Sequence, residues 1–207
     1  MGEMLSLDKV EQYVEEFATG DGKINEVAAG FSQQELRDFL LDNIDRLATM
    51  VEQMDAAQLA YRPSGPPTGW DASGDEAHFD ASQLCTHVVS GISFHWWGIT
   101  RALGQPRPDF PKPPAGALAT GVKGGVMGAG GWSGESGLTL SVQLREAAGR
   151  FLDYLGEQQD LHAATGISSM GPFKKLTAHS WVMLDAVHIA MHVRQLERMQ
   201  SAPDYPL

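Results

Sequence analysis

The segment Lys174–Gln200 reads KKLTAHSWVMLDAVHIAMHVRQLERMQ, and its pattern decides the fold. Apolar residues recur along it at helical spacing, which predicts one long helix over the whole stretch. His188 and His192 lie on the apolar stripe. Residues at i and i+4 differ by about 40° around a helix axis and lie about 6 Å apart along it, so both imidazoles can face one object. A divalent metal ion is one candidate, and a hydrogen-bonded histidine pair is the more common alternative.

Three further segments place apolar residues at helical spacing. The first opens at the capping box Ser32–Glu35 and continues to Met54. The second runs from near Asp80 to Leu103 and ends at a glycine and a proline, and the third covers roughly Leu138–Gln158. A short amphipathic helix is predicted over residues 5–17, ahead of a glycine-rich turn. The four long segments therefore form the predicted framework of the fold.

The connection Gly104–Gly137 is rich in proline and then in glycine, and it is too long for a tight helix hairpin. No alternation of apolar and polar residues indicates a strand. We therefore predict an all-α fold, a four-helix bundle with one long crossover connection and a short N-terminal helical extension. The predicted boundaries are residues 1–31 for the extension and residues 32–207 for the bundle domain.

Composition excludes several classes of function. A chain of 207 residues that is 43% hydrophobic suits one globular domain. Its 15 basic against 26 acidic residues argue against nucleic acid as a partner. No secretory signal or bilayer-length apolar run is present, so we expect a cytoplasmic protein without a membrane partner. The glycines near residue 120 lack the lysine of a phosphate loop, because Val122 occupies that position. The single cysteine, Cys85, is expected to be a small buried hydrophobe.

His87 is the strongest partner for the histidine pair. It lies within the second predicted helix, on the same stripe as its apolar residues, so it is expected to face the core. His95 is eight residues further on, about 80° away around the axis and about 12 Å along it, so one ion cannot bind both. His179 falls on the face opposite His188. The remaining histidines, His78 and His162, fall in predicted loops and are expected at the surface.

These residues resemble a known family. His87 in SQLCTHV, followed by His188-x-x-x-His192-x-x-Gln195 in the last helix, is similar to the pattern of the DinB/YfiT-like superfamily of metalloenzymes. The resemblance covers roughly residues 32–200 and includes Trp70 before the second helix. It implies a four-helix bundle, often a homodimer, whose His87, His188 and His192 hold nickel or zinc. The pattern departs at Val193-Arg194, where the family commonly has Arg-Gly, and residues 1–31 are an addition.

A site with three neutral imidazole ligands leaves the ion an open position for water or a thiol, and either supports transfer or hydrolysis. Asp185 is a candidate general base or an acceptor for a ligand's ring N–H, although a solvated carboxylate on the helix face explains it as well. Gln195 is a candidate for orienting a ligand or substrate, against a simple hydrogen bond in the core. The tryptophans 96, 97 and 132 suit a pocket wall or ordinary packing between helices.

Three classes of function follow. The first is a divalent-metal-dependent enzyme of unknown substrate, with a small-thiol-dependent transferase or isomerase and a hydrolase as the reactions that the resemblance suggests. The second is a helical bundle that binds a metal or a small ligand without turnover. The third is a bundle with core histidines and no metal. For the enzyme, the expected partners are a small-molecule substrate, including a low-molecular-weight thiol, and a second copy of the chain.

Overall fold

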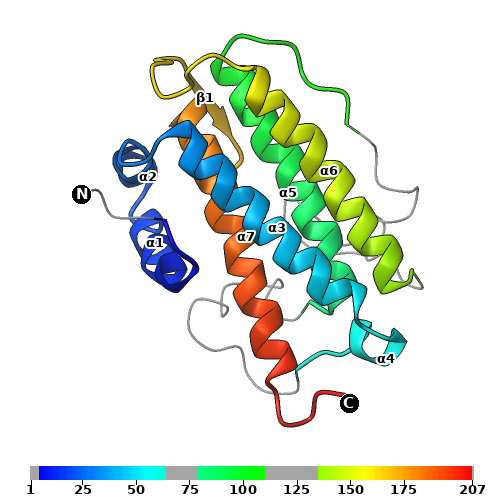
Figure 1. Cartoon of the computed structure of the whole chain (residues 1–207). Helices are drawn as coiled ribbons and strands as arrows, with labels where there is room; N and C mark the ends of the chain where they lie inside the picture. The colour runs from blue at the N-terminus through cyan, green and yellow to red at the C-terminus, as the bar shows by residue number, and fades with distance from the viewer. Residues whose placement is uncertain (1–4, 64–78, 111–134, 207) are drawn as a thin grey trace.

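Four long helices packed side by side form most of the computed structural model, which describes residues 5–63, 79–110 and 135–206 (Figure 1). Helix α3 packs against α6 and α7, and α5 packs against the same two helices. The bounds are Gln33–Glu52 for α3, Ala81–Ala102 for α5, Gly137–Glu157 for α6 and Ala178–Gln200 for α7. The mostly helical fold that the sequence predicts is therefore confirmed, with one small sheet added to it.

Each long helix begins at a side-chain cap. Ser32 accepts from the Glu35 amide while the Glu35 carboxylate accepts from the Ser32 amide, which is the capping box that the sequence predicts. Asp80 and Gln83 form a second capping box at the start of α5. Because these caps satisfy backbone N–H groups that lack partners within the helix, they fix where each helix starts.

The sheet is a hairpin that corrects the predicted start of the last helix. Strands β1 (Ile167–Met170) and β2 (Phe173–Thr177) pair antiparallel, and Gly171 in the turn has φ +54°. Helix α7 therefore begins at Ala178 and not at Lys174, because the Thr177 side chain caps it by accepting from the Ser180 amide. The expectation of no strand was wrong, since β2 is too short and too rich in lysine to alternate visibly.

The N-terminal residues pack on this framework as short helices. A 3-10 turn (Leu7–Lys9) and α1 (Val10–Phe17) match the helix predicted over residues 5–17, while α2 (Asp21–Ala28) and α4 (Ala56–Leu59) are additional. Helix α1 contacts α7, and α2 contacts both α7 and β2. The Asp21 carboxylate accepts from the backbone amides of Lys174 and Lys175 at 2.6 and 2.8 Å. Helix α2 is thereby held against the hairpin.

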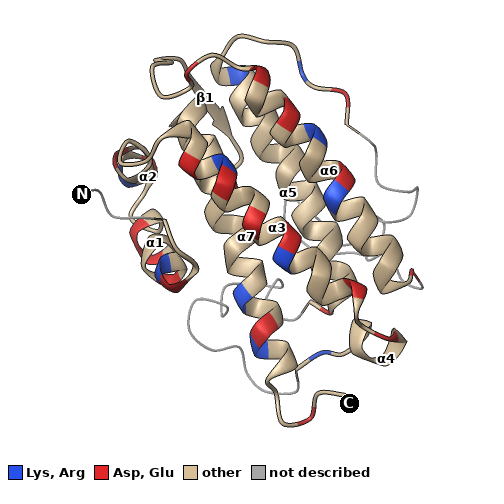
Figure 2. Cartoon of the chain, in the orientation of Figure 1, with Lys and Arg blue, Asp and Glu red and all other residues tan. Residues whose placement is uncertain are grey.

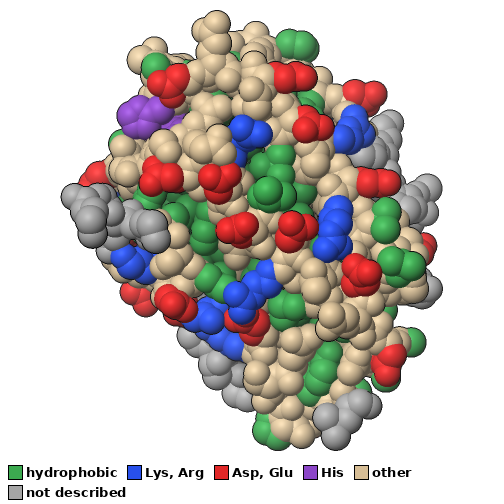
Figure 3. Space-filling view, in the orientation of Figure 1, with side chains coloured by type: hydrophobic (Ala, Val, Ile, Leu, Met, Phe, Trp, Pro, Cys, Tyr) green, Lys and Arg blue, Asp and Glu red, His purple; other side chains and the backbone are tan. Residues whose placement is uncertain are grey.

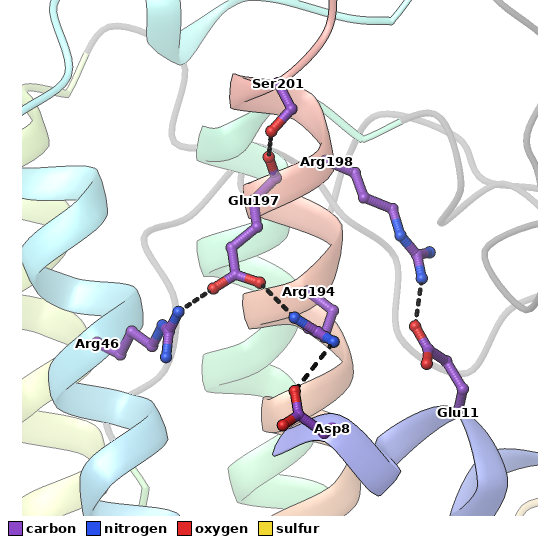
Figure 4. A network of polar contacts seen from close by, with 7 residues as sticks. All are labelled: Asp8, Glu11, Arg46, Arg194, Glu197, Arg198 and Ser201. Carbon is purple, nitrogen blue, oxygen red and sulfur yellow. Dashed lines mark hydrogen bonds and ion pairs between the residues drawn. The ribbon is translucent and has the colours of Figure 1, made fainter.

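A network of charged side chains links α1, α3 and the last turns of α7 (Figure 4). Arg194 bonds to Glu197 at 3.1 Å and to Asp8 at 3.4 Å, and Arg46 bonds to Glu197 from α3. Arg198 bonds to Glu11 in α1 at 2.6 Å. Such exposed pairs contribute about 0–1 kcal/mol each. The Arg194 guanidinium is therefore engaged by carboxylates and not by the histidines of α7.

The two helices that carry the histidines are nearly free of charge on their buried turns. The charged side chain of α5 is Arg101, and the first half of α7 contains one, Asp185. In Figure 2 the blue and red segments of α7 lie in its last turns. On the face of the molecule shown in Figure 3, acidic and basic side chains are interspersed over α3 and α6. None of the described helices combines the length and the apolar character that a membrane span requires. Because the turns of α5 and α7 that face each other are mostly apolar, a polar side chain buried between them needs a specific partner.

Candidate metal centre

Three histidines meet between α5 and α7. The Nε2 atom of His188 lies 2.9 Å from Nε2 of His87 and 3.1 Å from Nε2 of His192. His87 and His192 are 1% and 0% exposed, and His188 as a whole residue is partly buried. One nitrogen from each ring lies within 4.8 Å of the others, so the three residues can hold a metal ion. The structure thus brings together the set that the sequence predicts.

The antiparallel packing of α5 and α7 creates this meeting point. His87 on α5 contacts His192 on α7, Gly91 lies opposite His188, and Gly98 lies opposite Trp181. Residue numbers therefore rise along α5 as they fall along α7. Since residues four apart lie on one face of a helix, both helices present their site residues along one shared seam.

Gly91 provides the space for the His188 ring. A Cβ atom at this position would lie 2.5 Å from Cε1 and 2.9 Å from Nδ1 of His188, well inside van der Waals contact. Any larger residue would push the ring away from His87 and His192, unless the helices moved apart. The glycine thus serves the site, although its sequence context marks it only as a residue inside a helix.

Gln195 determines the protonation of His192. Its Oε1 atom lies 2.8 Å from Nδ1 of His192, and an amide oxygen accepts, so the ring proton is on Nδ1. In a neutral ring the other nitrogen then carries a lone pair, and the His192 Nε2 atom aims it at the centre of the trio. Orientation of a ligand histidine by a hydrogen bond on its other nitrogen is a common feature of metal sites. The sequence-based role of Gln195 beside the ligands agrees with this contact.

Burial keeps the rings of α7 neutral. It lowers the pKa of His192 to about 4, against a smaller raising effect of the bond to Gln195. Burial also holds the pKa of His188 well below its usual range, and the neighbouring rings of His192, His87 and His95 act in the same direction. Neutral imidazole is the form that binds a metal ion. His188 and His192 are therefore in their ligating form at neutral pH.

The spacing and chemistry of the trio fit a divalent ion. Ligand nitrogens about 2.0–2.1 Å from an ion lie about 2.9 Å apart at right angles and about 3.3 Å apart in a tetrahedron. The observed separations of 2.9 and 3.1 Å fall in this range. Neutral imidazoles suit zinc, copper, iron and nickel. The residues present therefore fit the metal that the sequence resemblance implies.

Asp185 is not the solvated carboxylate that the sequence allows, because its side chain is 0% exposed. Its Oδ1 atom accepts from Nδ1 of His95 at 2.5 Å. His95, which is 3% exposed, lies outside the trio, as the helical geometry predicts, but it belongs to a second group with Asp185 and His188. The sequence does not reveal this pairing, because angles within one helix cannot relate two residues on different helices.

The other candidate residues have structural roles. His179 is buried, and its Nε2 lies 3.0 and 2.9 Å from the carbonyls of Ala28 and Phe31. His162 is exposed and Cys85 is fully buried, as predicted, and burial raises the pKa of the Cys85 thiol. Trp96 stacks within the core on aromatic residues of α6, and Arg107 and Arg101 lie over the Trp97 ring. Predictions for Trp70, His78, Trp132 and most of the connection after α5 fall outside the described residues.

Comparison of the chain with family models, curated proteins and solved structures finds no match. Evidence for a function therefore comes from the residues of the site and from their geometry.

Proposed function

We propose that this chain is a divalent-metal-dependent enzyme in which His87, His188 and His192 hold one nickel or zinc ion. The convergence of three Nε2 atoms carries this proposal. The tautomer of His192 places a lone pair at the centre, where the Nε2 atoms of His87 and His188 also converge. A cation accepts all three lone pairs at once.

The same proposal includes the fold type and the family. We propose that α3, α5, α6 and α7 form the four-helix bundle of a DinB/YfiT-like protein. The cyclic packing of these helices supports it, as does the position of one ligand on the second long helix and two on the fourth. The contact between Gln195 and His192 gives the third element of the pattern a physical role.

An ion with three neutral ligands keeps its positive charge and an open position, where it acidifies a bound water or thiol near neutral pH. The protein side of the site supports this chemistry. His87 and His192 are 1% and 0% exposed, so these two rings would keep bulk water away from their sides of the ion. Gln195 keeps the His192 ring oriented. Close by, the Asp185 carboxylate holds the proton on Nδ1 of His95.

For the reaction, we propose transfer of a low-molecular-weight thiol to an electrophile, isomerisation of a maleyl-type diacid, or hydrolysis of a simple ester or amide. The resemblance supports the first two, and an activated water supports the third. Arg194 does not serve an anionic substrate, because its guanidinium is engaged by Asp8 and Glu197. We further propose that the protein acts in the cytoplasm as a homodimer.

The alternative function is a bundle that binds a metal or a small ligand without turnover. The near-complete burial of His87 and His192 favours it, because two of the three ligand rings are closed to solvent. Both functions include a bound metal, and only the enzyme turns over a substrate. An activity assay therefore distinguishes them.

The test is metal content followed by activity. Protein loaded with zinc or nickel and then gel-filtered is expected to retain metal, whereas His192→Gln is expected to lose it. His162→Gln, at an exposed histidine, is the control and should behave as the parent protein. Turnover in one of the three reaction classes, lost in His192→Gln, supports the enzyme. Bound metal without turnover across the panel supports the alternative, and a protein that retains no metal contradicts both.

A further inference from the structure

A second group of ligating side chains lies directly beside the trio. His95, Asp185 and His188 each offer a nitrogen or oxygen atom within 4.8 Å of the others. His95 and Asp185 are 3% and 0% exposed. Neither belongs to the three-histidine centre, and the proposed function assigns them no ion. The group is therefore a separate candidate for ligand binding.

The two groups are consecutive layers of one seam. Along α5, His87, Gly91 and His95 follow one another at intervals of four residues. Across the seam, His192 faces His87, His188 lies over Gly91, and Asp185 bonds to His95. The ring centroid of His188 is 4.9 Å from that of His87 and 5.3 Å from that of His95. His188 is thus the one ring common to both layers.

Two buried polar atoms at this junction have no hydrogen-bond partner among the described residues, namely Oδ2 of Asp185 and Nδ1 of His188. Leaving such atoms unpaired costs about 1–3 kcal/mol each, and more for a charged oxygen. The single bond from His95 to Oδ1 leaves the second carboxylate oxygen of Asp185 free to coordinate. Carboxylate oxygen and imidazole nitrogen together form a usual ligand set for zinc.

We propose that His95, Asp185 and His188 hold a second divalent ion, so that His188 bridges two metals. This inference rests on the proposed function, because the first ion must occupy the Nε2 side of His188. The second ion binds at Nδ1 of His188, and the ring proton on that nitrogen passes to solvent when the bridge forms. Asp185 and the deprotonated ring supply the negative charge that keeps two nearby cations together.

The first test is zinc stoichiometry, measured by elemental analysis after dialysis against buffered zinc. The parent protein is expected to bind two zinc ions per chain, and Asp185→Asn, which keeps the side-chain size, is expected to bind one. His179→Gln replaces another buried histidine of α7 outside both groups and should keep two. One ion in the parent that His192→Gln removes overturns the second site alone. No ion in the parent overturns the proposed function as well.

A second measurement on the unaltered protein covers the case in which Asp185→Asn does not fold. Copper(II) binds imidazole well and has one unpaired electron. When a second equivalent of copper is added, a bridging His188 ring couples the two spins, and the electron paramagnetic resonance signal per copper falls. A signal that doubles without coupling, or that stops growing after one equivalent, overturns the bridged pair.

Discussion

Replacement of Gly91 by alanine tests whether the packing of α5 on α7 builds the metal centre. The added Cβ would lie 2.5 Å from Cε1 of His188, a distance that the structure cannot hold. Because His188 contacts both other ligands, any movement of its ring opens the trio. Overpacking of this kind costs about 1–3 kcal/mol of folding stability. Loss of ligand orientation lowers metal affinity about 10–100-fold.

Two control variants separate the site from general packing. Gly98→Ala makes a comparable clash on α5, with the Trp181 ring at 2.4 Å, and it should lower stability while zinc affinity stays close to that of the parent. Gly149→Ala on α6 meets nothing within 4 Å and should raise stability by about 0.5–1 kcal/mol. Urea melts give the stabilities, and titration against a competing chelator gives the affinities. If Gly91→Ala and the parent protein bind zinc with equal affinity, the packing of the His188 ring against Gly91 is not needed for the metal centre.

Two further predictions concern the hydrogen-bonding and charge state of the rings. In the unfolded, metal-free chain, His192 takes up a proton as the pH falls below its usual pKa of about 6.5. In the folded protein the ring stays neutral until about pH 4. The unfolded state therefore binds more protons between these two values. The free energy of unfolding should therefore fall by about 3 kcal/mol between pH 6.5 and about 4 because of His192, and His188 should lower it further. Urea melts across this pH range measure the change. A constant free energy of unfolding would contradict the neutral buried rings. Gln195→Leu removes the acceptor for His192 Nδ1 and should weaken zinc binding about 10–100-fold, whereas unchanged binding would show that the contact does not orient the ligand.

The elements set by local chemistry could be predicted from the sequence. The capping box at Ser32 and the stop after Leu103 depend on neighbouring residues, and the helices begin and end close to the predicted positions. The hairpin could not be predicted in this way, because β2 is five residues long and carries Lys174 and Lys175 at consecutive positions. Its stability depends on pairing with β1 and on contacts with α2, which no pattern within the segment reveals.

Some residues of the candidate site can likewise be predicted from patterns within one helix, and others depend on how two helices pack. The pair His188 and His192 is visible within one helix, and His87 follows from its place on the apolar stripe of another. The bond between His95 and Asp185 depends on the register between two helices that are far apart in the chain. Once Gly91 is known to lie under His188, the pairing follows by counting four residues along α5 to His95 and three residues back along α7 to Asp185. Tertiary packing therefore supplies the second layer of the site.

The most direct test of the metal centre is a crystal structure of zinc-loaded protein with data collected on both sides of the zinc absorption edge. We expect an anomalous peak between His87, His188 and His192, with each Nε2 atom about 2.0–2.2 Å from the ion. Zinc-saturated crystals that show no peak at this position, or zinc bound only elsewhere on the molecule, would contradict it.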